Sequence, residues 1–208
     1  MGTTTRLVLA SNNAKKLAEL QQLFAPLGVT LVTQGSLGIA EAEEPFGSFV
    51  ENALVKARHA ARLSGLPALA DDSGLAVEAL NGAPGVLSAR YASLFGRPKS
   101  DAENNRALLE QLQPFAAPSQ RAARFVCALV AVRSTTDPEP LIAMGRWQGQ
   151  ILSAQVGEGG FGYDPLMFIP SLGRSVAELS AAEKNALSHR ALAAADLVAQ
   201  MREVWHLG

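Results

Sequence analysis

Apolar residues fall into short runs and helical stripes from the first residues of the chain. The run 7–10 predicts a strand, and the leucines that follow recur at spacings of three and four residues over 17–27, which predicts an amphipathic helix. Gly28 ends this pattern, as a glycine after a helix commonly does. The chain is therefore expected to begin with a strand, a polar turn and a helix.

Serine followed three residues later by glutamate precedes an apolar stripe at several places, which is the pattern of a helix capping box. These pairs are Ser48 with Glu51, Ser100 with Glu103, and Ser180 with Glu183. Each predicts the start of a helix. The last pair opens an alanine-rich region over 180–204, in which Ser188 and His189 predict a break and a second helix.

The apolar runs 125–132, 141–147 and 166–169 predict sheet strands. Asp71-Asp72-Ser73-Gly74 has the composition of a turn, so we expect it to separate two short strands, one ending at Ala70 and the other covering 75–79. Strands and helices intermix and no composition shift marks a boundary. The sequence predicts an α/β fold with a mixed central sheet flanked by helices, as a single domain over residues 1–208.

Composition narrows the class of partner. The chain has 208 residues, 18 Lys+Arg against 19 Asp+Glu, and a net charge of −1, which argues against a nucleic-acid polymer as partner. Cys127 is the only cysteine, so we expect a buried, inert thiol. The apolar run after Arg6 is too short for a signal segment and no later run has the length of a membrane span, so we expect a cytoplasmic protein.

The turn between the first strand and helix has the chemistry of a phosphate site. Its residues are Ser11, Asn12, Asn13, Ala14, Lys15 and Lys16. Backbone N–H groups, a hydroxyl, amides and the Lys16 ammonium would converge at a helix start, where an anion binds well. The alternative is an ordinary helix cap, which the turn considered alone favours.

Acidic residues supply a second candidate site. Asp71 and Asp72 would point in different directions, so that one anchors the chain and the other meets a hard cation such as Mg²⁺ beside a phosphate. Lys56 and the upstream Glu44 add a cation and a carboxylate near one helix start. An ordinary turn and a solvated helix face are the alternatives.

A glycine-rich segment, Gly159-Gly160-Phe161-Gly162-Tyr163-Asp164-Pro165, places aromatic rings where the backbone can approach a ligand closely. It favours stacking on a nucleobase over the alternative, a hairpin turn with core aromatics. Further along, Lys184, His189 and Arg190 could donate to a phosphate or a carbonyl oxygen, although isolated basic residues often lie on the surface.

Taken in order, six motifs resemble the inosine triphosphate pyrophosphatase family: L-A-S-N-N-A-K-K, E-N-A-L-V-K-A-R, A-D-D-S-G-L, G-A-P-G-V-L-S-A-R-Y-A, G-G-F-G-Y-D-P and L-S-H-R. The resemblance spans about 7–190. It implies two lobes around a nucleotide cleft, a homodimer and a Mg²⁺ requirement. It also implies hydrolysis of non-standard purine nucleoside triphosphates (ITP, dITP and XTP) to the monophosphate and pyrophosphate.

The resemblance also implies roles for individual residues. Ser11, Asn13 and Lys16 would contact the triphosphate and Lys56 would add a cation. Asn12, Ala14, Lys15 and Ser73 would also bind the substrate. The metal carboxylates would be Glu44 and Asp72, and Asp72 would also take a proton from the attacking water. The remaining substrate-binding residues would be Phe161, which stacks on the base, Gly162, Tyr163, Asp164, Lys184, His189 and Arg190.

The substrate preference has a physical basis within this resemblance. Hypoxanthine and xanthine carry a 6-oxo acceptor where adenine carries an amino group, so donors from His189 or Arg190 would be left unpaired by ATP. Pro45-Phe46-Gly47 departs from the family pattern beside Glu44, and Lys15 stands where glycine is frequent. The rival functions are a Maf-type pyrophosphatase acting on pyrimidine or modified nucleotides, and a non-catalytic nucleotide sensor.

Overall fold

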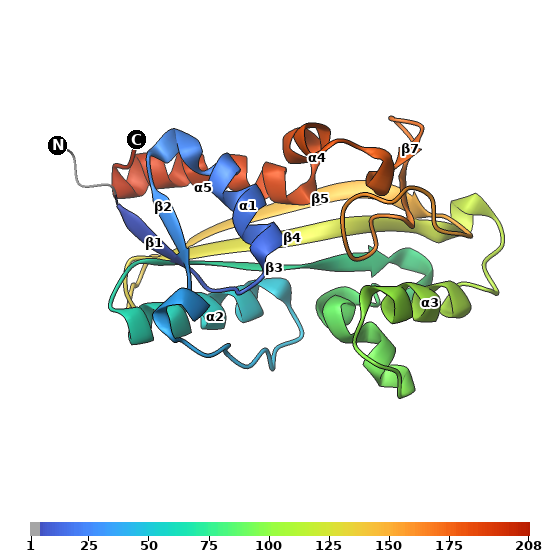
Figure 1. Cartoon of the computed structure of the whole chain (residues 1–208), viewed down its shortest axis with the longest axis horizontal. Helices are drawn as coiled ribbons and strands as arrows, with labels where there is room; N and C mark the ends of the chain where they lie inside the picture. Colours follow the sequence, from blue (N-terminus) through green and yellow to red (C-terminus); the bar gives the residue numbers. More distant parts are fainter. Residues whose placement is uncertain (1–4) are drawn as a thin grey trace. The chain divides into compact units, whose positions relative to one another are not determined.

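The computed structural model describes residues 5–208 (Figure 1). The start of the chain, on which the expectation of no signal segment partly rests, lies outside the described residues. A seven-stranded sheet has the order β2-β1-β3-β4-β5-β6-β7. Its strands are β1 (Arg6–Leu9), β2 (Thr30–Thr33), β3 (Ala68–Val77), β4 (Ala122–Val132), β5 (Leu141–Ile151), β6 (Met167–Ile169) and β7 (Arg174–Ser175).

The sheet is mixed, as the sequence predicts. Strand β1 pairs in parallel with both β2 and β3, whereas β6 pairs antiparallel with β5 and β7. The α-helices are α1 (Ala14–Leu23), α2 (Phe49–Ser64), α3 (Asp101–Gln111), α4 (Ala181–Leu187) and α5 (His189–Trp205). Short 3₁₀ helices are η1 (Ala25–Leu27), η2 (Gly35–Leu37), η3 (Glu78–Leu80), η4 (Gly85–Phe95), η5 (Pro118–Arg121) and η6 (Val176–Glu178).

The serine caps are confirmed where the sequence places them. Ser48, Ser100 and Ser180 each accept a hydrogen bond from the backbone N–H three residues later, at the starts of α2, α3 and α4. The break at Ser188 is also confirmed, because α4 ends at Leu187 and α5 begins at His189. These signals succeed because a cap joins residues that are close in the sequence.

The predicted acidic turn is wrong. β3 is one continuous strand from Ala68 to Val77, and Asp71 and Asp72 lie in its middle, both buried. The turn preference of Asp, Ser and Gly is overridden because the strand flanks are apolar and buried and both carboxylates have cationic partners. Strand β2 and helix η4 are further elements that the sequence pattern does not predict.

Two compact units divide the described residues. The first holds the residues up to Asp72 with Cys127–Gly145 and Arg190–Gly208, and the second holds Ser73–Val126 and Arg146–His189. Strands β3, β4 and β5 each contribute residues to both. That residues 1–208 form a single domain stays a prediction. Within the described part of the chain, no helix has the length and apolarity needed to span a membrane.

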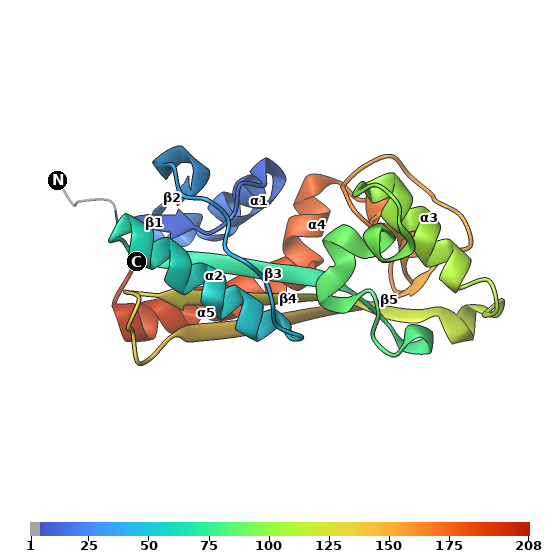
Figure 2. The same cartoon turned by 90° about the horizontal axis from the view of Figure 1, so that it is seen from below.

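The first unit has a helix layer on each face of its strands. Leu7, Leu9 and Cys127 pack with buried residues of α1 and α5, whereas Val8 and Val130 pack with the alanines of α2. Alternate strand residues thus serve opposite faces. Figure 1 shows α1 and α5 on one side of these strands and α2 on the other, and in Figure 2 α2 lies in front of them.

The second unit has its own hydrophobic core, to which β3, β4, β5 and β6 contribute. Leu108 of α3 and Tyr91 of η4 are buried there together with Leu75, Phe125 and Tyr163. Helices α3 and η4 lie side by side, which Figure 1 also shows. This packing places the glycine-rich segment, which precedes β6, beside the first turns of α3.

Candidate functional site

Asp71 is the centre of a buried charge cluster in the first unit. Arg190 donates from Nε to Asp71 Oδ2 at 2.8 Å, Lys16 pairs with Oδ1, and the Cys127 Sγ lies 3.4 Å from Oδ2. Burial by itself would raise the pKa of Asp71, but the charges of Arg190 and Lys16 hold it well below its ordinary value. Asp71 is therefore an ionised anchor, and the thiol of Cys127 is buried, as the sequence predicts.

Arg190 is itself enclosed by carboxylates. Besides Asp71 it pairs through Nη1 with Glu19 of α1, and the guanidinium side chain is 2% exposed. Burial would lower the pKa of Arg190, but the two carboxylates raise it above its ordinary value. Sequence reasoning missed Glu19. Its position three residues after Lys16, on the same face of α1, is the signal that could have found it.

Asp72 belongs to a second group of charges. Lys56 donates from Nζ to Asp72 Oδ1 at 3.0 Å, to Glu44 Oε1 at 2.7 Å and to the Asp71 carbonyl oxygen at 3.0 Å. One ammonium group of α2 thus joins two carboxylates that lie far apart in the sequence. Because successive side chains of a strand point to opposite faces, Asp71 and Asp72 reach different cations.

The second oxygen of Asp72 distinguishes it from Asp71. Asp72 Oδ2 is buried, and no described residue gives it a hydrogen bond. Burial raises the pKa of Asp72; Lys56 opposes this rise and the nearby Glu44 adds to it. A buried acceptor without a donor is costly in a folded protein, so this atom is suited to a water or a cation.

The donor set fits Mg²⁺ that arrives with a phosphate. Among residues 5–208, no group of three or more His, Cys, Asp or Glu side chains is gathered at a metal-binding distance. Mg²⁺ is commonly held by one or two carboxylates, with waters and substrate phosphates as its other ligands. Glu44 and Asp72 are two carboxylates that share the Lys56 ammonium, and Asp72 Oδ2 is a buried oxygen with no hydrogen bond from a described residue, so this pair fits such a site.

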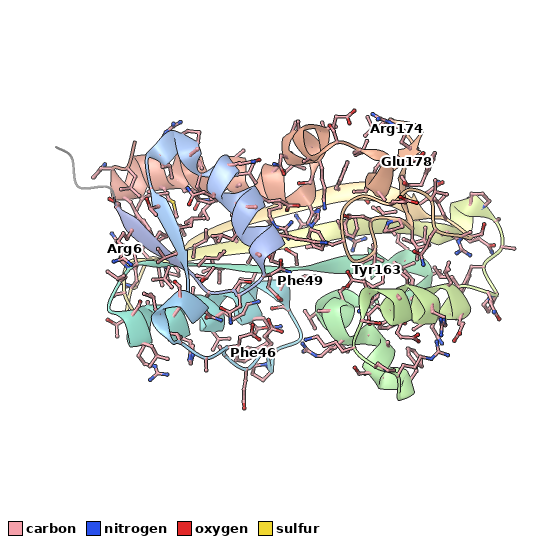
Figure 3. The ribbon with its side chains drawn as sticks, in the orientation of Figure 1. Arg6, Phe46, Phe49, Tyr163, Arg174 and Glu178 are labelled. Carbon is pink, nitrogen blue, oxygen red and sulfur yellow. The ribbon has the colours of Figure 1, made fainter. Side chains whose placement is uncertain are left out.

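The loop before α2 is fixed in spite of its unusual sequence. The side-chain amide of Asn52 accepts from the Phe46 N–H at 3.0 Å and donates to the Phe46 carbonyl at 3.1 Å. Figure 3 labels Phe46 in this loop and Phe49 at the first residue of α2. Asn52 therefore holds the loop that carries Glu44, whose carboxylate reaches Lys56.

The turn 11–16 caps its helix. Asn13 Oδ1 accepts from the N–H groups of Lys15 and Lys16, and Ser11 Oγ accepts from the Asn13 N–H. Asn12 accepts from the Gly35 N–H at 2.8 Å and so ties the turn to η2. Helix α1 starts at Ala14. Asn13 is thus the N-cap of α1, and a phosphate-binding role for these residues stays a prediction.

In the second unit, Asp164 organises the glycine-rich segment. Its Oδ2 accepts from the Phe161 N–H at 2.8 Å and from Lys184 Nζ at 2.7 Å. The same ammonium lies 4.2 Å from the centre of the Phe161 ring, which is a cation–π contact. Three of the predicted substrate-binding residues, Phe161, Asp164 and Lys184, are therefore brought together.

Other predicted residues of this unit have different environments. The Tyr163 hydroxyl donates to the Ser88 carbonyl at 2.9 Å, and burial raises its pKa. Tyr163, labelled in Figure 3, is thus a core residue whose polar end is already used. His189 stacks on Phe125 with ring centres 4.9 Å apart. Ser73 is half-buried in β3.

Gly162 is held by residues that the sequence analysis missed. Its N–H donates to Asp101 Oδ2 at 2.8 Å, and its carbonyl accepts from Asn105 Nδ2 at 3.0 Å. The partners lie 61 and 57 residues away in the sequence, so no local pattern identifies them. Asp101 and Asn105 are one helical turn apart at the start of α3, which allows both to face the same glycine.

The fold and these two sets of residues define a mixed α/β protein with a buried Asp–Lys–Arg cluster in one unit and an aromatic glycine-rich loop in the other. The chain belongs to the Ham1 family, whose sequence model matches residues 7–200. It is 62% identical to a protein of Leptothrix cholodnii over 97% of this chain and 99% of that protein, and 63% identical to one of Methylibium petroleiphilum over 96% and 99%. Both relatives are named dITP/XTP pyrophosphatase. A solved HAM1 protein from Coxiella burnetii superposes with a TM-score of 0.88 at 46% identity, over 97% of this chain and 100% of that chain.

Proposed function

We propose that the protein is a nucleoside triphosphate pyrophosphatase that hydrolyses non-standard purine nucleoside triphosphates, ITP, dITP and XTP, to the monophosphate and pyrophosphate. The observation that carries this proposal is Asp72, whose Oδ1 is fixed by Lys56 while its buried Oδ2 has no donor among the described residues. Near-full-length similarity to proteins named dITP/XTP pyrophosphatase supports the substrate class.

Glu44 and Asp72 would hold Mg²⁺. When bound, this ion neutralises charge on the phosphoryl group under attack. The clustering of both carboxylates on Lys56 Nζ supports the assignment, because it shows that their side chains reach a common cation. Asp72 Oδ2 would also orient the attacking water and accept its proton, a role for which a carboxylate of raised pKa is suited.

The cations would bind the phosphates. Lys56 and Lys16 each lie against a carboxylate of the Asp71-Asp72 pair, and a triphosphate would offer them further anionic oxygens. The turn 11–16 and Ser73 would add hydrogen-bond donors. Asp71, held by Arg190 as well as Lys16, would keep the Lys16 ammonium in place.

The base would be recognised by the glycine-rich segment of the second unit together with His189 or Arg190, of which Arg190 also pairs with Asp71 and Glu19. Phe161 would stack on the purine, and Gly162, Tyr163, Asp164 and Lys184 would set the shape of the loop that carries the ring. Donors from His189 or Arg190 would pair with the 6-oxo group of hypoxanthine or xanthine. Adenine would leave such donors unpaired, which is costly in a buried site.

We further propose that the protein is cytoplasmic and forms a homodimer. We also propose that it binds a small nucleotide and not a nucleic-acid polymer. The balance of 18 Lys+Arg against 19 Asp+Glu supports the second point. Light scattering after gel filtration tests the dimer. A mass of one chain at working concentrations would contradict it.

Product analysis tests the reaction. Purified protein is incubated with ITP and Mg²⁺, and the products are separated by ion exchange. The proposal expects inosine monophosphate and pyrophosphate in equal amounts, with Asp72→Asn as the inactive control. Inosine diphosphate with inorganic phosphate would contradict the cleavage site, and binding of ITP without products would favour the nucleotide-sensor alternative.

A further inference from the structure

Helix α3 holds one glycine of the aromatic loop by both of its backbone polar groups. Asp101 accepts from the Gly162 N–H at 2.8 Å, and Asn105 donates to the Gly162 carbonyl at 3.0 Å. Gly162 has a φ of 62°, a left-handed conformation that glycine adopts readily. Two side chains of one helix thus fix the position and the orientation of this peptide.

The residue before Gly162 is held independently. The Phe161 N–H donates to Asp164 Oδ2, and Lys184 joins that carboxylate to the face of the Phe161 ring. Asp164 and Lys184 act from within the loop and from α4. Asp101 and Asn105 act from α3, so the backbone next to the ring is fixed from a second element.

The environment of the Asn105 amide also points to the hydrogen bond with Gly162 as its function. It is 3% exposed, and its Oδ1 is buried without a hydrogen-bond partner among the described residues. An apolar side chain of the same size would spare the fold this unsatisfied acceptor. The Asn105 side chain therefore leaves its oxygen unsatisfied inside the fold, while its amide nitrogen donates to the Gly162 carbonyl.

We propose that Asp101 and Asn105 are positioning residues that hold Gly162 so that the Phe161 ring is placed for stacking on the purine. This inference rests on the proposed function, since it takes Phe161 as the ring that meets the base. The two side chains act through the loop backbone and not on the reacting phosphates. Their loss should therefore weaken nucleotide binding and leave the chemical step largely intact.

Asp101 offers a matched pair of variants. Asp101→Ala removes the acceptor for the Gly162 N–H, whereas Asp101→Asn keeps an oxygen there. We expect Asp101→Ala to raise the KM for ITP roughly five- to tenfold, the loss of about one hydrogen bond, with kcat within about twofold of the unchanged protein. Asp101→Asn should restore most of the affinity.

Asn105→Leu separates positioning from stability. It removes the donor to the Gly162 carbonyl and also the buried unsatisfied oxygen. We expect an unchanged or higher Tm together with a KM for ITP raised roughly five- to tenfold. A merely structural residue would show a lower Tm with KM unchanged. Arg106→Ala, an exposed neighbour on the same helix, is the control.

A double-mutant cycle tests the route through the ring. In a Phe161→Ala background, Asp101→Ala and Asn105→Leu should each change ITP binding by less than about twofold, because the ring that they position is absent. Binding is measured by calorimetry without metal, so the result does not depend on turnover. Full additivity with Phe161→Ala would overturn the proposal, as would unchanged binding in both single variants. If the unchanged protein binds ITP and ATP equally and releases no pyrophosphate, the proposed function fails, while the cycle still decides the role of α3.

Discussion

Arg190 and Asp71 form a buried ion pair, with 2.8 Å between Arg190 Nε and Asp71 Oδ2. The neighbouring Asp72 pairs instead with Lys56, which also pairs with Glu44, because adjacent residues of β3 face opposite ways. Adjacent aspartates thus have separate environments. Both oxygens of Asp71 pair with a cation, Arg190 or Lys16, whereas Asp72 has one buried oxygen without a donor among the described residues.

Replacing each aspartate by asparagine should separate stability from activity. Asp71→Asn removes the buried negative charge that Arg190 and Lys16 share and leaves Arg190 with Glu19 alone, so we expect the free energy of unfolding to fall by about 3–5 kcal/mol. Asp72→Asn should lower turnover by at least about 10²-fold with ITP binding still measurable, because a proton acceptor is lost. Urea unfolding and pyrophosphate release measure the two effects. Substantial turnover in Asp72→Asn would refute its assignment.

Lys56→Met removes the cation between Glu44 and Asp72. We expect kcat/KM for ITP to fall at least about tenfold, since the two carboxylates then repel each other and a phosphate loses its cation. Lys56→Arg keeps the charge and should recover part of the activity. Lys99→Met, an exposed lysine, is the matched control. Equal kcat/KM for Lys56→Met and Lys99→Met would exclude Lys56 from the site.

Arg190→Ala should affect both the fold and the choice of base. Asp71 and Glu19 lose a shared partner, so the Tm should fall. If the guanidinium also contributes to reading the 6-oxo group, the ratio of kcat/KM for ITP over ATP should narrow by roughly tenfold or more. The ratio is measured in the folded variant at low temperature. A lower Tm with an unchanged ratio would place base reading in other residues.

Acid should lower the free energy of unfolding by protonating Asp137, which lies far along the chain from Asp71 and Asp72. Hydrogen bonds from Arg133 hold the pKa of Asp137 at about 2. Since an unfolded aspartate has a pKa of about 3.9, this stabilisation is complete above that pH and is lost as the pH falls toward about 2. With screening at the half-exposed Arg133, we expect about 1–2 kcal/mol.

Urea unfolding at pH 6 and pH 2.5 tests this expectation. Asp137→Asn should be less stable than the unchanged protein at pH 6, and most of that difference should vanish at pH 2.5. Glu203→Gln, an exposed carboxylate on α5, controls for general charge effects. A difference that stays constant between the two pH values would contradict the assigned pKa shift.

Local sequence patterns predict much of the fold. They fail where residues that are far apart in the sequence form the stabilising contacts. The capping serines succeed because donor and acceptor are three residues apart. The sequence predicts a turn in the middle of β3, because the partners that stabilise Asp71 in the strand, Lys16 and Arg190, lie 55 and 119 residues away. A short stretch of sequence around Asp71 contains neither Lys16 nor Arg190.

The residues of the candidate site likewise fall into those that the sequence could predict and those that it could not. Lys16, Lys56 and Asp72 could be proposed from residue type and position, and the structure brings the charges of the first unit together. Asn12 and Tyr163 also lie in the predicted motifs, yet they form hydrogen bonds with Gly35 and Ser88 of the protein itself. Residue type does not reveal whether a polar group is already paired. The hydrogen bonds of Asp101 and Asn105 to Gly162 could not be predicted because Gly162 is distant from them in the sequence.

Pyrophosphate release with a panel of nucleotides is the most direct test of the proposed Mg²⁺-dependent activity on non-standard purine nucleoside triphosphates. ITP, dITP, XTP, ATP, GTP, TTP and UTP are compared at equal concentration, each with Mg²⁺ and with excess EDTA. We expect kcat/KM for ITP, dITP and XTP to exceed kcat/KM for ATP by at least about 10²-fold, because ATP would leave a buried donor unpaired. We also expect EDTA to abolish turnover. Equal turnover of ATP and ITP, or full activity in EDTA, would contradict the proposed activity.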